Sequence, residues 1–162
     1  MIRNARMGDV KQIYSLLQHF ADKDLLLGRS LSSLYDQLRD FKVVVDSDEE
    51  QQIIGACALH ICWDNLAEIR SLAVAEGCQG KGVGAELVKA SLAEAETLGI
   101  SRIFTLTYQP DFFKNFGFKD IDKGELPHKV WSDCIQCSKF PDCNEEALIW
   151  DRDTENDLFD SI

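Results

Sequence analysis

The sequence predicts an α/β (α+β) fold in which a mixed central sheet is flanked by helices. Three observations lead to this prediction. Two amphipathic helical segments come early, two β-type segments meet at a charged turn, and a strand, a glycine-rich turn, a helix and a strand then follow in order. The chain has 162 residues and no internal repeat, so we expect one domain over residues 1–150, followed by an acidic, solvated tail over residues 151–162.

Both early helices are predicted from apolar residues at helical spacing. The first runs from Val10 to Phe20, and Asp9 is its expected N-cap. The second follows Ser30, a residue type that caps helices well, and its apolar stripe runs from Leu31 to Phe41.

The first two long strands are predicted on either side of a charged turn. Lys42 to Asp46 is a short β-branched run, and Ile53 to Trp63 is apolar on both alternating faces. A strand that is apolar on both faces is typical of the inside of a sheet. The connection is short enough for a hairpin.

A βαβ unit is expected next. The strand Ala67 to Val74 leads into the glycine-rich turn Gly77 to Gly84, and a helix then runs from about Val83 to Leu98. Gly99 is its expected C-cap, and Arg102 to Tyr108 is the next strand.

The last third of the chain is less regular. Pro110 is expected to begin a short helix that ends at Gly117, and a last strand is predicted over Glu146 to Trp150. Residues 126–143 form an irregular segment that carries cysteines.

The charge of the chain excludes several classes of partner. The net charge is −11, and the stretch from Glu145 to Asp160 alone contributes −6. An acidic protein of this kind is not expected to bind nucleic acid or an anionic membrane surface. The apolar run Ile53 to Trp63 is far shorter than the ~20 residues that span a bilayer. With Gly8 and Asp9 in place of an apolar signal core, we expect a cytoplasmic protein whose six cysteines are thiols or metal ligands.

The turn from Gln79 to Gly84 is the first candidate site. It places three glycines at the start of a helix, where free backbone N–H groups and the helix dipole favour an anion such as a pyrophosphate. The spacing differs from those of the nucleoside-triphosphate loop and the dinucleotide turn. A tight strand-to-helix connection without a ligand is the alternative.

Three segments resemble motifs of the GNAT acetyltransferase superfamily. Gln79, Gly82 and Gly84 match its Gln-x-x-Gly-x-Gly motif, the strand from Glu68 to Val74 looks like its central strand, and Phe113 to Phe118 resembles its Tyr-x-x-x-Gly-Phe ending. The resemblance covers about residues 2–122 and implies the GNAT fold, N-acetyltransferase activity and acetyl-CoA as cosubstrate. It also implies coenzyme contacts through the strand backbone and the turn, at Leu72, Ala73, Val74, Gln79, Gly80, Lys81, Gly82, Val83 and Gly84. Lys81 could equally be a solvated surface lysine. Homodimers are common in that family, although no feature of the sequence tests this.

The chain is further similar to the acetyltransferase domain of the N-acetylglutamate synthases, especially their short, kinase-less bacterial form. The matching segments are Leu25–Ser30, Gly55–His60, Ala67–Val74 and Phe104–Tyr108. The resemblance implies acetylation of the α-amine of a small amino acid, with L-glutamate and arginine biosynthesis as the first expectation. A dicarboxylate is best held by guanidinium groups, and Arg29 and Arg70 are the candidates. Gln109 stands where the longer synthases have an arginine, so glutamine, another amino acid or glutamate held differently remain alternatives.

Two residues are candidates for proton transfer. Strand alternation places Glu68 on the same face as Arg70, from where its carboxylate could accept the amine proton; a structural Glu–Arg pair is the alternative. The usual tyrosine acid of the family is replaced by Phe113, which leaves Tyr108 as the nearest acid. A buried core tyrosine, with solvent supplying the proton, explains Tyr108 nearly as well.

The cysteine-bearing segment raises the question of a structural zinc ion. Cys134, Cys137 and Cys143, preceded by His128, could supply four ligands, and reduced buried thiols are the alternative. Cys57, Cys62 and Cys78 are interpreted as core or loop thiols, and His19 and His60 as structural histidines.

Two other functions remain open. A GNAT enzyme acting on a peptide, a protein or a polyamine would need an open groove in place of an arginine-lined pocket, and the acidic body would suit a basic substrate. A non-catalytic acyl-CoA-sensing module would keep the phosphate-binding parts and is consistent with Phe113 and Gln109.

Overall fold

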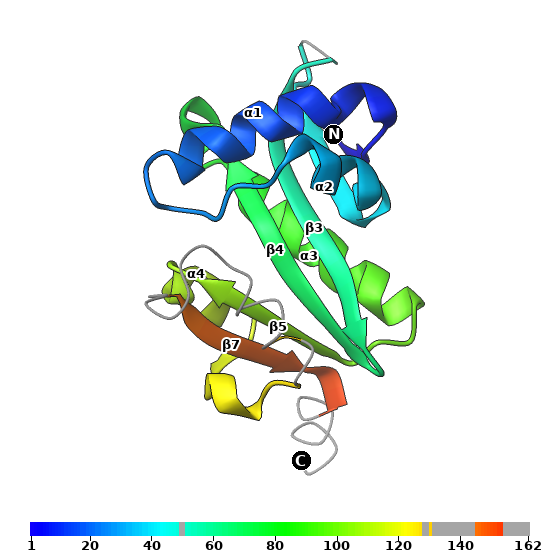
Figure 1. Cartoon of the computed structure of the whole chain (residues 1–162), viewed down its shortest axis with the longest axis vertical. Helices are drawn as coiled ribbons and strands as arrows, with labels where there is room; N and C mark the ends of the chain where they lie inside the picture. Colours follow the sequence, from blue (N-terminus) through cyan, green and yellow to red (C-terminus); the bar gives the residue numbers. More distant parts are fainter. Residues whose placement is uncertain (49–50, 128–129, 131–144, 154–162) are drawn as a thin grey trace. The chain divides into compact units, whose positions relative to one another are not determined.

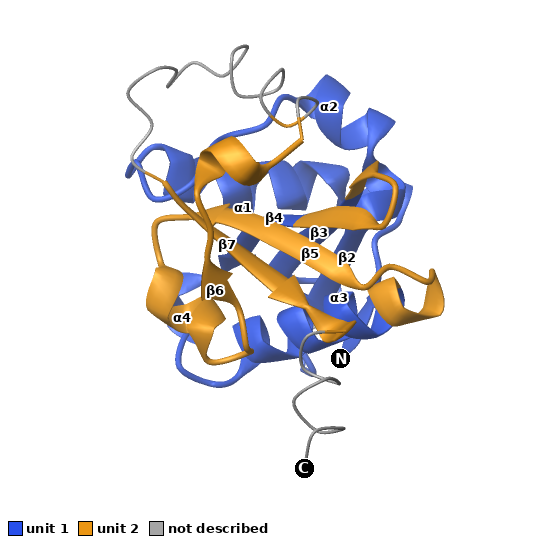
Figure 2. Ribbon diagram, turned by 90° about the horizontal axis from the view of Figure 1, so that it is seen from below, with its two compact units in different colours: residues 1–60, 69–94 blue, residues 61–68, 95–162 orange. Residues whose placement is uncertain are grey.

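A computed structural model of the chain describes residues 1–48, 51–127, 130 and 145–153 (Figure 1). The strands form a mixed seven-stranded sheet in the order β1-β2-β3-β4-β5-β7-β6. The described part of the chain divides into two compact units, residues 1–60 with 69–94 and residues 61–68 with 95–162 (Figure 2). No helix in the described ranges is both long and apolar enough to cross a membrane.

The first unit is built on antiparallel strands. β1 (Ile2–Asn4) pairs with β2 (Phe41–Val45), and β2 pairs with the first half of β3 (Ile53–Trp63). A bulge between Val44 and Val45 shifts the register of the second pair. The unit also holds most of β4 (Leu66–Val74).

Three helices and short 3-10 turns complete the first unit. The helices are α1 (Val10–Ala21), α2 (Leu31–Asp36) and α3 (Val83–Thr97), which reaches into the second unit at its end. The 3-10 turns are η1 (Met7–Asp9), η2 (Leu38–Asp40) and η3 (Glu76–Cys78).

Small residues let β3 be buried on both faces. Ala56 and Ala58 belong to the core cluster that α1 covers with Ile13 and Leu17. On the opposite face, a Cβ atom added to Gly55 would lie 2.7 Å from Cγ1 of Val83 in α3. Figure 1 shows α1 and α3 on opposite sides of the β3 ribbon. The predicted two-sided burial of this strand is confirmed.

The second unit has its own sheet and core. The beginning of β4 pairs in parallel with β5 (Arg102–Thr107), which pairs antiparallel with β7 (Glu146–Asp151), and β7 pairs with the short β6 (Lys119–Asp120). The helix α4 (Pro110–Lys114) and the turn η4 (Lys123–Glu125) connect these strands. Its core cluster contains Cys62, Leu66, Phe104, Leu126, Val130 and Ala147.

Most of the predicted helices and strands are confirmed. Two of the predicted helix caps have the expected geometry. The Ser30 hydroxyl accepts a hydrogen bond from the Ser33 backbone N–H at 3.0 Å, as predicted for the N-cap of α2. Gly99 has a φ of +78° directly after α3, which is the left-handed conformation of a glycine C-cap.

The structure differs from the predictions in three details. The second helix ends at Asp36 instead of continuing to Phe41, because Phe41 pairs with Ala58 as the first residue of β2. The strand β1 has three residues, too few to show an alternating pattern. Asp9 occupies the N-cap position of α1 as predicted, but its side chain makes no capping hydrogen bond, because the carboxylate has other partners.

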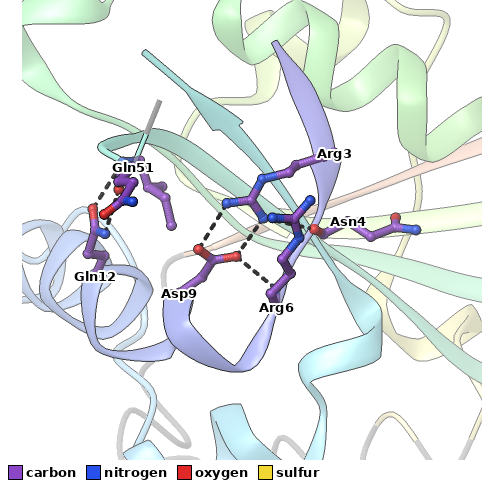
Figure 3. A network of polar contacts seen from close by, with 7 residues as sticks. Arg3, Asn4, Arg6, Asp9, Gln12 and Gln51 are labelled. Carbon is purple, nitrogen blue, oxygen red and sulfur yellow. Dashed lines mark hydrogen bonds and ion pairs between the residues drawn. The ribbon is translucent and has the colours of Figure 1, made fainter. Parts of the chain in front are cut away.

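Asp9 instead joins β1 to the turn that precedes α1 (Figure 3). Its two carboxylate oxygens accept hydrogen bonds from the Arg3 guanidinium at 2.7 and 3.0 Å, and one also accepts from the Arg6 backbone N–H at 2.7 Å. The Arg3 hydrogen bonds hold the pKa of the Asp9 carboxyl below its usual value, and burial opposes this only in part. Nearby, Gln12 bonds to the backbone of Gln51 and Ile53 and ties α1 to the start of β3.

We expect Asp9→Asn to lower the free energy of unfolding by about 2 kcal/mol at neutral pH, the scale of a lost hydrogen bond to a charged group. Because the folded-state pKa is lowered, this stabilisation is complete above the unfolded pKa near 3.9 and disappears as the pH falls through the folded value. Urea unfolding of both proteins between pH 7 and pH 3 measures the difference, which should shrink toward acid. Asp64→Asn, at an exposed turn, is the control. A difference that stays constant to pH 3 would assign the effect to packing.

Candidate active site

The glycine turn lies between η3 and α3 and exposes its backbone. Gly80 and Gly82 have φ values of +77° and +84°, and no atom lies within 4 Å of the position that a Cβ would take at either residue. Val83 begins α3, and the first intrahelical hydrogen bond runs from the Glu86 N–H to the Gly82 carbonyl at 3.0 Å. The first N–H groups of α3 have no intrahelical acceptor, so the turn can surround an anion with backbone donors.

The end of β4 is held to this turn by Gln79. Its side-chain amide donates to the Val74 carbonyl at 3.1 Å, while the Ala75 N–H donates to the Ile54 carbonyl at 2.9 Å. Ala73 is buried in the core, whereas Leu72 and Val74 are partly exposed. Gln79 therefore has a structural role that the sequence motif alone did not specify.

Ser71 is an irregular position within β4. It is buried and has a φ of +56°, a left-handed conformation that non-glycine residues rarely adopt. Residues held in such sparsely populated backbone conformations concentrate at functional sites. Ser71 separates Arg70 from the three residues assigned to the coenzyme by the family resemblance.

The structure brings together Arg29 and Arg70, the two candidates for carboxylate binding. Nη2 of Arg70 donates to Oε1 of Gln37 at 2.7 Å, and Nη2 of Arg29 donates to the same oxygen. Arg29 also donates to the Ser33 hydroxyl, and its guanidinium carbon lies 5.2 Å from the centre of the Phe41 ring. Two positively charged groups thus meet at one neutral side chain.

An exposed ion-pair cluster lies before the glycine turn. Glu76 in η3 accepts from Lys23 and lies 3.1 Å from Nε2 of His19 in α1. These hydrogen bonds, that of Lys23 first, hold the pKa of Glu76 below its usual value. Lys81 is exposed, so its side chain remains available to an anion or to solvent. The negative charge of Glu76 is compensated locally, which limits its repulsion of an anion at the turn.

The two candidates for proton transfer belong to the second unit. Glu68 lies in the part of β4 that pairs with β5, where it is opposite Phe104, and its side chain is half-buried. Tyr108 directly follows β5 and is also half-buried. Gln109 is exposed at the start of α4, and its backbone N–H donates to the Thr107 hydroxyl at 2.9 Å.

Phe113 and the thiols of the described residues are structural. Phe113 is 4% exposed, and its ring packs against Phe118 at 5.4 Å between centroids. Burial raises the pKa of the Cys57 thiol to about 12, so that thiol is not a nucleophile at neutral pH. Cys62 is also buried, and Cys78 is partly buried in its loop.

The remaining candidates are the two histidines and the predicted metal ligands. His60 contacts Asp40 at 2.7 Å and His19 contacts Glu76, as expected for structural histidines. No group of three potential metal ligands occurs among the residues that the structure describes. Cys134, Cys137, Cys143 and His128 lie outside those residues.

Sequence reasoning missed Gln37 and Ser33. A usable signal was present for this pair, because Ser33 and Gln37 are four positions apart in a segment predicted to be helical, and such residues share one face of a helix. The same segment carries an apolar stripe, which predicts only that the helix packs against the core.

The comparisons with known proteins agree on one family. Residues 10–118 match the family model described as "Acetyltransferase (GNAT) family". An "Uncharacterized N-acetyltransferase" of Chlorobaculum tepidum is 38% identical over 148 residues, which cover 91% of this chain and 94% of that protein. An "Amino-acid acetyltransferase" of Mycobacterium tuberculosis is 34% identical over 133 residues, covering 82% of this chain and 76% of that protein.

Two solved structures have the same fold. A Mycobacterium tuberculosis protein in complex with CoA matches with a TM-score of 0.81 and 29% identity, over 93% of this chain and 98% of that chain. The N-acetylglutamate synthase of Neisseria gonorrhoeae, complexed with coenzyme A and N-acetyl-glutamate, matches with a TM-score of 0.83 and 27% identity. That match covers 93% of this chain and 34% of the synthase. From the family model, the relatives and the shared fold, we conclude that the chain belongs to the acetyltransferase (GNAT) family and is an acyltransferase.

Proposed function

We propose that the protein transfers the acetyl group of acetyl-CoA to the α-amine of a small amino acid, and that L-glutamate is this acceptor. The observation that carries the proposal is the meeting of Arg29 and Arg70 at the side-chain oxygen of Gln37. Guanidinium groups bind carboxylates through paired, charge-assisted hydrogen bonds. Two of them at one point favour an acceptor with two carboxylates over a cationic polyamine.

The relatives support this choice of acceptor. The Mycobacterium tuberculosis relative is named an amino-acid acetyltransferase, and the Neisseria gonorrhoeae structure holds N-acetyl-glutamate. By this analogy the reaction would serve arginine biosynthesis. Gln109 lacks the charge of the arginine found there in longer synthases, so Arg29 and Arg70 would carry carboxylate recognition in this chain.

The residues of the glycine turn fit a coenzyme. The space at Gly80 and Gly82 lets phosphate oxygens approach the backbone, and the start of α3 presents N–H donors to them. We assign the pyrophosphate to Gln79, Gly80, Lys81, Gly82, Val83 and Gly84, and the pantetheine arm to the backbone of Leu72, Ala73 and Val74. When bound, acetyl-CoA supplies an activated acetyl thioester.

Glu68 and Tyr108 are the proposed proton carriers. An amine must lose a proton to be acetylated, and the thiolate that leaves must gain one. We assign the first task to the Glu68 carboxylate and the second to the Tyr108 hydroxyl. Both side chains are half-buried, and Phe113, in the core, has no proton to donate.

An acyl-CoA-sensing module is the second candidate. It is favoured by the burial of Phe113 at the position where the family usually has a tyrosine. Such a protein would bind acetyl-CoA and release no thiol with any amine.

Several expectations from the sequence stay predictions. These are the cytoplasmic location, homodimerisation, the single domain over residues 1–150, the acidic tail and zinc binding by the cysteine-bearing segment.

The proposed function predicts thiol release from acetyl-CoA when glutamate is present and much less with glutamine, aspartate or a polyamine. Arg70→Lys should raise the KM for glutamate by about tenfold, which corresponds to 1.4 kcal/mol, because lysine cannot form a bidentate pair. The KM for acetyl-CoA should stay unchanged. Arg102→Lys, at an exposed arginine 3.9 Å from Asp151, is the matched control. Faster turnover with a polyamine than with glutamate would contradict the proposal.

The coenzyme assignment predicts that Gly82→Ala raises the KM for acetyl-CoA by about tenfold. An alanine at this φ costs roughly 1–2 kcal/mol, so the turn should relax away from the geometry that holds an anion. Steady-state kinetics with varied acetyl-CoA measure this effect. Gly77→Ala is the control, because Gly77 also has open space around it but lies in η3 without a positive φ. Equal effects of both substitutions would argue against the assignment.

The proton-transfer assignments predict that Glu68→Gln and Tyr108→Phe each lower kcat by about 10²-fold, the lower end of general acid–base effects. Coenzyme affinity should change little, as measured by calorimetric titration with CoA. Tyr14→Phe in α1 removes the same hydroxyl elsewhere and should leave kcat unchanged. Unchanged turnover of either site variant would remove that residue from the mechanism.

A further inference from the structure

We propose that Gln37 is a positioning residue that sets the specificity of the enzyme for dianionic amino acids. It would do so by holding Arg29 and Arg70 at a fixed position without neutralising them. The inference rests on the proposed function. It adds a residue that lies outside the three family motifs described above. Gln37 lies at the end of α2, away from the glycine turn and from both proton-transfer candidates in the sequence.

Gln37 is held in place by the local structure of its own segment. The Ser30 hydroxyl caps α2, and the Gln37 backbone N–H donates to the Ser33 carbonyl at 3.0 Å. The helix ends there, because Gln37 has a φ of −116° and a ψ of 24°. Its side chain therefore begins from a defined point on the face that also carries Ser33.

Arg29 approaches this point with its orientation already restricted. Its Nε and Nη2 donate to the Ser33 hydroxyl at 3.2 and 2.8 Å, and Nη2 also donates to Oε1 of Gln37. The Phe41 ring lies 5.2 Å from the guanidinium carbon, within the range of a cation–π contact. All these partners come from one continuous segment of the chain.

Arg70 comes from β4, and Gln37 connects it to that segment. Its Nη2 lies 2.7 Å from Oε1 of Gln37. A guanidinium group only donates hydrogen bonds, so the amide must turn its oxygen toward both arginines and its NH₂ group away from them. One oxygen thereby orients two cations from distant parts of the sequence.

The neutrality of the amide is the important property. A carboxylate at this position would make the same two contacts more strongly, but it would lower the charge of the cluster by one. An amide adds no negative charge of its own beside the two guanidinium groups. A dianion gains more than a monoanion from a cluster that carries one negative charge less.

The test compares Gln37→Glu with Gln37→Met in the full chain. Gln37→Glu keeps the size and the two acceptor contacts but adds a negative charge. It should raise the KM for glutamate by about tenfold and lower the preference for glutamate over glutamine, measured as the ratio of kcat/KM values, by a similar factor. Gln37→Met keeps the shape and the cluster charge but loses the acceptor. It should raise the KM for both amino acids while leaving their ratio within about twofold, because only positioning is lost.

Two controls separate this role from folding. Gln51→Glu makes the same change of charge at an exposed position and should leave all constants unchanged. The KM for acetyl-CoA should stay the same in every variant, since a misfolded protein would lose coenzyme binding as well.

The outcomes distinguish this inference from the proposed function. A wild type that acetylates glutamate, together with a Gln37→Glu variant that keeps its KM and its preference, would overturn the role of Gln37 alone. A wild type that acetylates no amino acid, or only neutral ones, would overturn the proposed glutamate specificity and the role of Gln37 with it. A fall in preference confined to Gln37→Glu supports the inference.

Discussion

The close approach of α3 to β3 at Gly55 is the constraint on which the rest of the first unit depends. Val83, whose side chain occupies the space of a missing Cβ, is also the first residue of α3. The contact therefore fixes the beginning of the helix, where the glycine turn ends. On the other face of β3, Ala56 and Ala58 allow α1 to pack as closely. Small residues in one strand thus determine where the backbone of the glycine turn lies.

The two candidate sites of the first unit offer different kinds of chemistry. The glycine turn offers backbone N–H groups, so it depends on conformation more than on particular side chains. The arginine cluster offers side-chain cations, so it depends on the partners that orient them, Ser33, Gln37 and Phe41.

Much of the fold could be predicted from the sequence, because its signals are local. Ser30 begins α2 and Gly99 ends α3, and both act within a few residues of the sequence. The glycine spacing of the turn likewise reflects the local backbone conformation. The side-chain partner of Asp9 could not be predicted. Arg3 forms a charged hydrogen bond with its carboxylate, which is stronger than the expected bond to the helix backbone. The hydrogen bond between Gln37 and Arg70 could not be predicted either, because it joins the end of a helix to a strand residue 33 positions away.

Ser71 carries a consequence for the evolution and engineering of this protein. A buried serine in the left-handed region costs about 1–3 kcal/mol of stability that a regular strand residue would not. Glycine would remove this strain, yet the chain keeps a serine directly after Arg70. A substitution that relieves this strain would alter the backbone directly beside Arg70, which we propose binds the acceptor. The proposed acceptor site and the strained backbone are thus neighbours in β4, so a gain in stability at Ser71 is expected to affect that site.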